Sequence, residues 1–181
     1  GKSPGEKSVL SEQEAEDYYD LIEWAAKQPW SNGSIGLNGV SYLAISQYKV
    51  AALQPLSLKA ICPWEGFSDF YQDLGRPGGI REDGFVIMWG KLIAPYVREQ
   101  QYNHLLRDEW YKSLCADLKK ITVPALICGS FSDHCLHTRG SYRLFNQISS
   151  KHKWLYTHRE GKWAAYYSKE ALTFQLKFFD Y

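Results

Sequence analysis

Four short apolar runs constrain the fold of this 181-residue chain more than any other feature. They lie at residues 34–38, 58–64, 123–129 and 153–156. The longer segments between and around them carry apolar residues at helical spacing, so strands and helices are predicted to alternate. Alternation of this kind is typical of a mostly parallel sheet that helices cover on both faces. The sequence therefore predicts an α/β fold with about four strands.

Composition and charge exclude two classes of partner. Apolar residues make up 45% of the chain, charged residues make up 23%, and the formal net charge is +1. This balance gives no reason to expect nucleic acid as a partner. No apolar run approaches the roughly 20 residues that cross a bilayer, so no membrane partner is expected either.

The cysteines predict free thiols rather than disulfides, because they lack C-x-x-C spacing and most lie in or beside apolar runs. A reducing, cytoplasmic location follows as the expectation. The four cysteines are Cys62, Cys115, Cys128 and Cys135.

A serine between a predicted strand and a predicted helix is the sharpest local motif. Gly39, Val40 and Ser41 follow the first apolar run, and a buried helix is expected from Tyr42 onward. Gly39 leaves room for a strained turn that exposes the serine hydroxyl, and the backbone N–H of Tyr42 becomes a candidate oxyanion donor. Leu43 replaces the second glycine of the G-x-S-x-G pattern. A simple tight turn is the alternative interpretation.

A nucleophilic serine needs a base, and the base needs an acid that fixes its tautomer. Asp133 follows the third apolar run and His158 follows the fourth, in the order Ser, Asp, His. Both positions are strand ends, where a parallel sheet places functional loops. We therefore predict a triad of Ser41, Asp133 and His158. The alternative roles are a helix N-cap or turn for Asp133 and an exposed loop position for His158.

Two further interpretations concern the residues near this triad. Glu65 follows the second apolar run and is a rival acid. His134, Cys135 and His137 suggest a metal site, but their spacing matches no standard zinc pattern and no second ligand pair accompanies them. No metal and no cofactor are expected.

Several segments together resemble the cocaine esterase and X-prolyl dipeptidyl-peptidase-like hydrolases, called CocE/NonD hydrolases. Residues 16–48 resemble the nucleophile region of that family, including the string Gly39-Val40-Ser41-Tyr42-Leu43. The stretches at 63–73, 132–140 and 153–163 match the same family in order. The resemblance covers nearly the whole chain.

The resemblance implies a partial α/β-hydrolase fold. Residues 1–66 and 119–181 would form the core and residues 67–118 a helical cap. Family members are longer: they begin with further strands and a tyrosine that donates to the oxyanion, and they end with a jelly-roll domain. The chain is thus expected to be truncated at both ends, with an open sheet edge. Self-association, or a longer parent chain that supplies the missing strands, is expected to cover that edge.

The expected chemistry is acyl transfer through Ser41, with Asp133 and His158 as implied acid and base. The resemblance allows an acyl ester, an amino-acid ester or an X-Pro peptide as substrate. Trp64, Phe67 and Trp89 could line a substrate pocket, although core packing explains them equally well. The rival function is a catalytically silent α/β domain that binds a small molecule or a partner chain.

Overall fold

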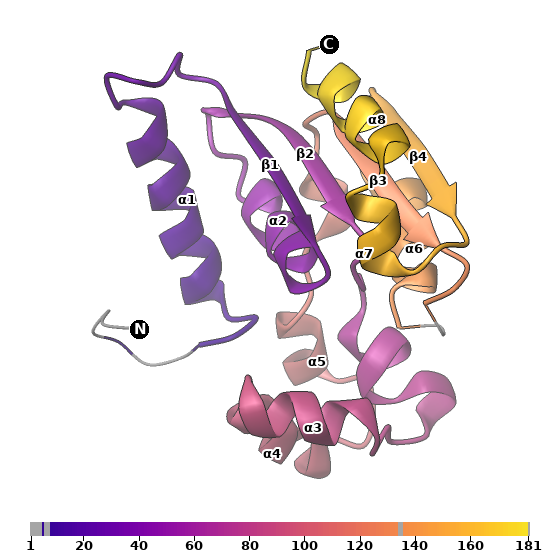
Figure 1. The fold of residues 1–181 in the computed structure, drawn as a ribbon. Helices are drawn as coiled ribbons and strands as arrows, with labels where there is room; N and C mark the ends of the chain where they lie inside the picture. The colour runs from indigo at the N-terminus through magenta and orange to yellow at the C-terminus, as the bar shows by residue number, and fades with distance from the viewer. Residues whose placement is uncertain (1–4, 6–7, 134–135, 181) are drawn as a thin grey trace.

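The computed structural model describes residues 5, 8–133 and 136–180. A parallel sheet runs through it in the order β1-β2-β3-β4 (Figure 1). The strands are β1 (Ile35–Val40), β2 (Leu58–Trp64), β3 (Ala125–Ser130) and β4 (Lys153–His158). Each lies within two residues of a predicted apolar run at both ends. The predicted α/β class with a mostly parallel sheet is confirmed.

Strand register brings the carboxyl ends of the four strands to one edge. Val40 pairs with Trp64, Trp64 with Cys128, and Ser130 with His158. Residues that immediately follow different strands therefore lie near one another, although they are far apart in sequence.

Helices cover both faces of the sheet, and alternate strand residues face each layer. On one face, Leu37, Ile61 and Ile127 share a core with α1, α2 and α6. On the other face, Trp64 and Cys128 pack against α7 and α8. Two buried faces require nearly continuous apolar strands, which is why these runs stand out in the sequence. These helices are α1 (Glu12–Ala26), α2 (Tyr42–Ala52), α6 (Thr138–Gln147), α7 (Lys162–Tyr166) and α8 (Lys169–Phe179).

A side-chain cap begins α1 and also connects two helices. The Ser11 hydroxyl accepts a hydrogen bond from the Glu14 N–H at 3.0 Å. The Glu14 carboxylate accepts from the Leu10 N–H at 2.8 Å and from the Tyr42 hydroxyl at 2.6 Å. The carboxylate thus ties the start of α1 to the start of α2.

A helical segment lies beyond the carboxyl ends of β1 and β2 (Figure 1). It comprises a π-helix (Tyr71–Gly75), a 3₁₀ turn (Pro77–Gly79), α3 (Phe85–Leu92), α4 (Pro95–Asn103) and α5 (Glu109–Ser113). A second 3₁₀ turn (Leu118–Lys120) lies near the end of α2, where the Gln54 side chain donates to the Lys120 carbonyl at 2.8 Å, and leads into β3. Lys49 of α2 is buried, and its ammonium donates to the carbonyls of Leu10 at 2.5 Å and Ser113 at 2.6 Å.

The division into a core and a cap at residues 67–118 stays a prediction. Among the described residues, the helices fall short of the length and apolarity that a membrane crossing requires.

Candidate active site

Ser41 occupies a strained turn between β1 and α2. Its backbone adopts φ 60° and ψ −114°, a region that residues other than glycine rarely occupy and that costs about 1–3 kcal/mol. The Ser41 N–H donates to the carbonyl of Trp64 at 2.9 Å. The Ser41 carbonyl accepts from the N–H groups of Ala44 at 2.9 Å and Ile45 at 3.0 Å. Strand β2 and the first turn of α2 therefore hold the serine in this conformation.

Glycine at position 39 is required by the close approach of α2. A Cβ atom there would lie 2.5 Å from the Leu43 Cβ and 3.1 Å from the Leu43 carbonyl oxygen. The turn accommodates Leu43 in place of the second glycine of the motif because Gly39 itself leaves the space.

The Ser41 hydroxyl faces His137. The Oγ atom lies 3.2 Å from His137 Nε2, and His137 Nδ1 bonds the Asp133 carboxylate. The side chains of His137 and Asp133 are 3% and 15% exposed. In the tautomer with its proton on Nδ1, the ring donates to Asp133 and leaves Nε2 free to accept the serine proton. Nucleophile, base and acid are thus in contact.

The structure contradicts the expected pairing of His158 with Asp133. His158 Nε2 lies 2.8 Å from Glu65 Oε1, and the ring stacks on Trp64 at a centroid distance of 6.0 Å. Glu65 follows β2 at the same sheet edge and is fully buried, so its carboxylate needs a nearby donor. The geometry therefore brings the predicted rival acid to His158 and places His137 between Asp133 and Ser41.

Lys162, the first residue of α7, lies where the two histidine–carboxylate pairs meet. Its Nζ atom is 3.2 Å from His137 Nδ1, 3.5 Å from Asp133 Oδ1 and 3.9 Å from Glu65 Oε2. Lys162 was not predicted from the sequence, and His137 was considered there as a metal ligand rather than chosen for the triad.

The side-chain atoms of Glu65, Asp133 and His137 lie close enough together, within 4.8 Å, to suggest a metal site. The Lys162 ammonium already supplies a positive charge within this group, so the residues do not fit a metal ion well. His134 and Cys135, on which the metal interpretation also rested, lie outside the described residues.

Burial and charge shift the proton affinities of these groups. Burial lowers the pKa of His137, the Lys162 ammonium lowers it further, and together they outweigh the Asp133 carboxylate. Burial alone would raise the pKa of Asp133, but the hydrogen bond from His137 and the charges of His137 and Lys162 hold that pKa below its usual range. Burial raises the pKa of Glu65 although Lys162 opposes the shift. A neutral His137 beside an ionised Asp133 is the state that general base catalysis needs.

Tyr42 directly follows Ser41 and was predicted to donate its backbone N–H to the oxyanion. It is the first residue of α2, and its hydroxyl donates to Glu14 rather than pointing at Ser41. Its N–H precedes those of Ala44 and Ile45, which bond the Ser41 carbonyl. The oxyanion role of this N–H stays a prediction.

The structure places two of the predicted substrate-binding residues in the core. Trp64 is 0% exposed and packs on Tyr156 at a centroid distance of 5.2 Å. Phe67 is 4% exposed and packs on Phe70 at 5.6 Å. Both rings are buried against other aromatic rings, so neither is accessible at the surface of the site. Trp89 is half-buried, and its substrate role stays a prediction.

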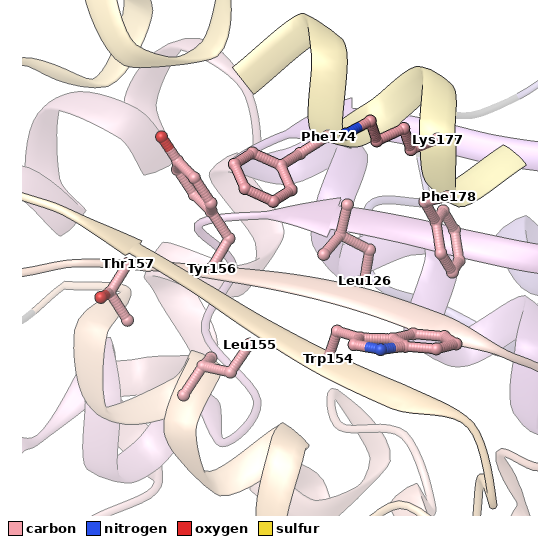
Figure 2. Close-up of a pocket in the computed structure, with 8 residues that line it drawn as sticks. All are labelled: Leu126, Trp154, Leu155, Tyr156, Thr157, Phe174, Lys177 and Phe178. Carbon is pink, nitrogen blue, oxygen red and sulfur yellow. The ribbon is translucent and has the colours of Figure 1, made fainter. Parts of the chain in front are cut away.

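An apolar pocket of about 520 Å³ lies elsewhere, between β4 and α8 (Figure 2). Ser41, Asp133 and His137 are not among its lining residues. The pocket is lined by Leu126, Trp154, Leu155, Tyr156, Thr157, Phe174, Lys177 and Phe178.

The architecture corresponds to a known class of enzymes. A parallel sheet with a strained serine between strand and helix defines the α/β-hydrolase fold. Within that class, residues 1–96 match the model of the X-Pro dipeptidyl-peptidase (S15) family, which is more than half of the chain. The chain belongs to this family, and the family resemblance seen in the sequence is confirmed.

Three relatives show the extent of the similarity. A solved CocE/NonD family hydrolase from Staphylococcus aureus is 45% identical, with a TM-score of 0.96 over 99% of this chain and 34% of that one. Cocaine esterase from a Rhodococcus species is 35% identical over 79 residues, 43% of this chain and 14% of that protein. The 2,6-dihydroxy-pseudo-oxynicotine hydrolase shares the fold at a TM-score of 0.70 and 19% identity, over 96% of this chain and 47% of that one. The chain thus spans about a third of the staphylococcal hydrolase.

Replacing Gly39 with alanine should destabilise the fold by about 1–3 kcal/mol, because the new Cβ would overlap Leu43. Urea denaturation measures this change. Gly161→Ala is the matched control, since a Cβ at Gly161 meets nothing within 4 Å and φ there is −60°. The control should cost less than Gly39→Ala, about 0.5–1 kcal/mol, because Gly161 is the N-cap of α7 and alanine suits that position less well. Equal stabilities of the two variants would contradict the packing described for the turn.

His137 should titrate below its ordinary pKa of 6.5, because burial and the Lys162 ammonium both disfavour the charged ring. Nitrogen-15 NMR of the imidazole signals across pH measures the midpoint, and His137→Asn identifies the resonance. A midpoint at or above 6.5 would show that the Asp133 carboxylate dominates instead.

Proposed function

We propose that this chain carries the catalytic residues of a serine hydrolase that cleaves esters or amides through an acyl-enzyme. The observation that carries the proposal is the contact of Ser41 Oγ with His137 Nε2 at 3.2 Å, with Asp133 bonded behind the ring. The strained backbone of Ser41 and its exposure at the strand end support the same role.

The reaction proceeds in two steps. His137 Nε2 takes the Ser41 proton while Oγ attacks the substrate carbonyl carbon, and the N–H of Tyr42 stabilises the oxyanion. The imidazolium then gives its proton to the departing alcohol or amine, which leaves the acyl group on Oγ. In the second step a water molecule loses a proton to His137 and attacks the acyl carbon, releasing the acid and restoring Ser41. Asp133 stabilises the imidazolium throughout.

The substrate class follows from the relatives and is part of the proposal. The family description names X-Pro dipeptidyl-peptidases, and one relative is a cocaine esterase. An acyl ester, an amino-acid ester or an X-Pro peptide is therefore the proposed substrate. The buried free thiols of Cys62 and Cys128 favour a reducing, cytoplasmic environment for the enzyme.

A fluorophosphonate probe tests the nucleophile, because it needs only an activated serine. The 181-residue chain should be labelled at Ser41, and Ser41→Ala should remove the label. His137→Gln should slow labelling by about 100-fold or more, the usual contribution of a general base. His158→Gln is the matched control: it still offers a donor to Glu65 and should label within a few-fold of the parent.

Two outcomes would contradict these assignments. If His158→Gln loses labelling and His137→Gln retains it, the base is His158, as the family resemblance implies. A folded chain with no adduct on Ser41 would favour the catalytically silent domain.

We also propose that a further strand pairs with β1, either from a second copy or from a longer parent chain. In the described part of the chain β1 pairs with β2 alone, which leaves its other edge open. In and just after α1, which contacts β1, the side chains of Leu21, Trp24 and Trp30 are 54%, 55% and 71% exposed. Open edges and apolar surface of this kind recruit further chains.

Sedimentation of the 181-residue chain should therefore detect self-association at micromolar concentration. Trp24→Lys combined with Trp30→Lys should reduce it, because the charges oppose apolar contact. A monomer with a cooperative melt and full esterase turnover would show that the chain needs no further strand.

A further inference from the structure

Lys162 has no part in the mechanism above, yet it lies at the centre of the charged cluster. It begins α7, and its side chain is 21% exposed. Its ammonium contacts Asp133 Oδ1 at 3.5 Å, His137 Nδ1 at 3.2 Å and Glu65 Oε2 at 3.9 Å. These three partners come from different parts of the sheet edge.

The charges of the cluster require a cation at this place. Glu65 is fully buried, and its Oε2 atom has no hydrogen-bond partner among the described residues. Asp133 lies near enough to raise the pKa of Glu65 by repulsion. Two carboxylates this close are costly to bury unless a positive charge lies between them. Lys162 supplies that charge.

The Lys162 ammonium also affects the pKa of the His137 ring. In the tautomer that places the His137 proton on Nδ1 for donation to Asp133, the Lys162 ammonium cannot donate to the same atom and acts on the ring through its charge. The other groups that act on this ring are the carboxylates of Asp133 and Asp73, while Ser41 contacts Nε2. Glu65 also lies within the same group of side chains.

We propose that Lys162 is a positioning residue for the proposed hydrolase: its ammonium holds the Asp133 carboxylate behind His137, links it to the Glu65–His158 pair, and disfavours a second proton on the resting imidazole. This inference rests on the proposed function. Lys162 acts through Asp133 and His137 and does not touch the substrate.

The charge of Lys162 should influence the pH at which the serine becomes reactive. His137 must be neutral to accept the Ser41 proton, and a nearby positive charge lowers its pKa. Removing the charge should raise that pKa, so activity should begin at higher pH. A shift of about one unit corresponds to labelling about tenfold slower at pH values below the midpoint.

The experiment measures fluorophosphonate labelling of Ser41 against pH in the 181-residue chain. Lys162→Met should move the midpoint upward by about one unit, and Lys162→Arg should restore the parent midpoint because it keeps the charge. Lys169→Met, at the exposed first residue of α8, changes the net charge equally and should leave the midpoint unchanged. A purely structural role for Lys162 would change the labelling rate at every pH without moving the midpoint.

The His137 ring signals in NMR give a second readout that does not depend on activity. Their midpoint should rise in Lys162→Met, and Lys162→Gln provides the same comparison if the methionine variant does not fold. Coincident midpoints in parent and charge-free variants, by labelling or by NMR, would overturn the proposal. Absence of labelling in the parent, with a shifted His137 midpoint in Lys162→Met, would instead refute the hydrolase and leave the electrostatic role of Lys162 standing.

Discussion

The hydrogen bond from the Ser41 N–H to the Trp64 carbonyl fixes the geometry on which the candidate site depends. It extends the pairing of β1 with β2 by one residue beyond Val40, so the chain enters α2 under strain rather than through a relaxed loop. The same pairing sets Glu65, the residue after Trp64, beside the serine. A local conformational cost of about 1–3 kcal/mol is thus offset by a sheet whose two central strands, β2 and β3, are almost entirely buried. Backbone hydrogen bonds of the sheet edge therefore hold the turn in its conformation.

The fold and part of the site could be predicted from the sequence because they depend on local signals. Apolar runs bounded by turn residues identify buried parallel strands, and the residue after each strand must lie at the common edge. Ser41 and Asp133 were therefore placed correctly at this edge from order alone. The cap at Ser11 is equally local, since it needs only a hydroxyl beside the first turn of a helix.

The remaining features depend on contacts that order along the chain does not specify. His137 lies four residues after Asp133, where the start of α6 turns its ring back toward Ser41. The order of residues after the strands predicts His158 as the base instead. That order does not specify that Glu65 binds the His158 ring. The closeness of His137 to Asp133 in the sequence was the available signal, but His137 was considered in a metal pattern with His134 and Cys135 and was not the histidine chosen for the triad. For Trp64 and Phe67, composition cannot distinguish an aromatic core from an aromatic pocket, because the same rings suit both.

The buried ammonium of Lys49 also constrains the order in which the chain folds. Its two carbonyl partners, in Leu10 and Ser113, are 39 and 64 residues away, so each bond closes a long loop. The entropic cost of closing these loops must be offset before the contacts stabilise the fold. Contacts of high sequence separation are therefore expected to form late. Helix α2 and its neighbouring strands β1 and β2 should therefore assemble before the N-terminal segment and α5 dock onto Lys49. The strand-end turn at Ser41 is thus expected to form before the helical segment beyond it docks.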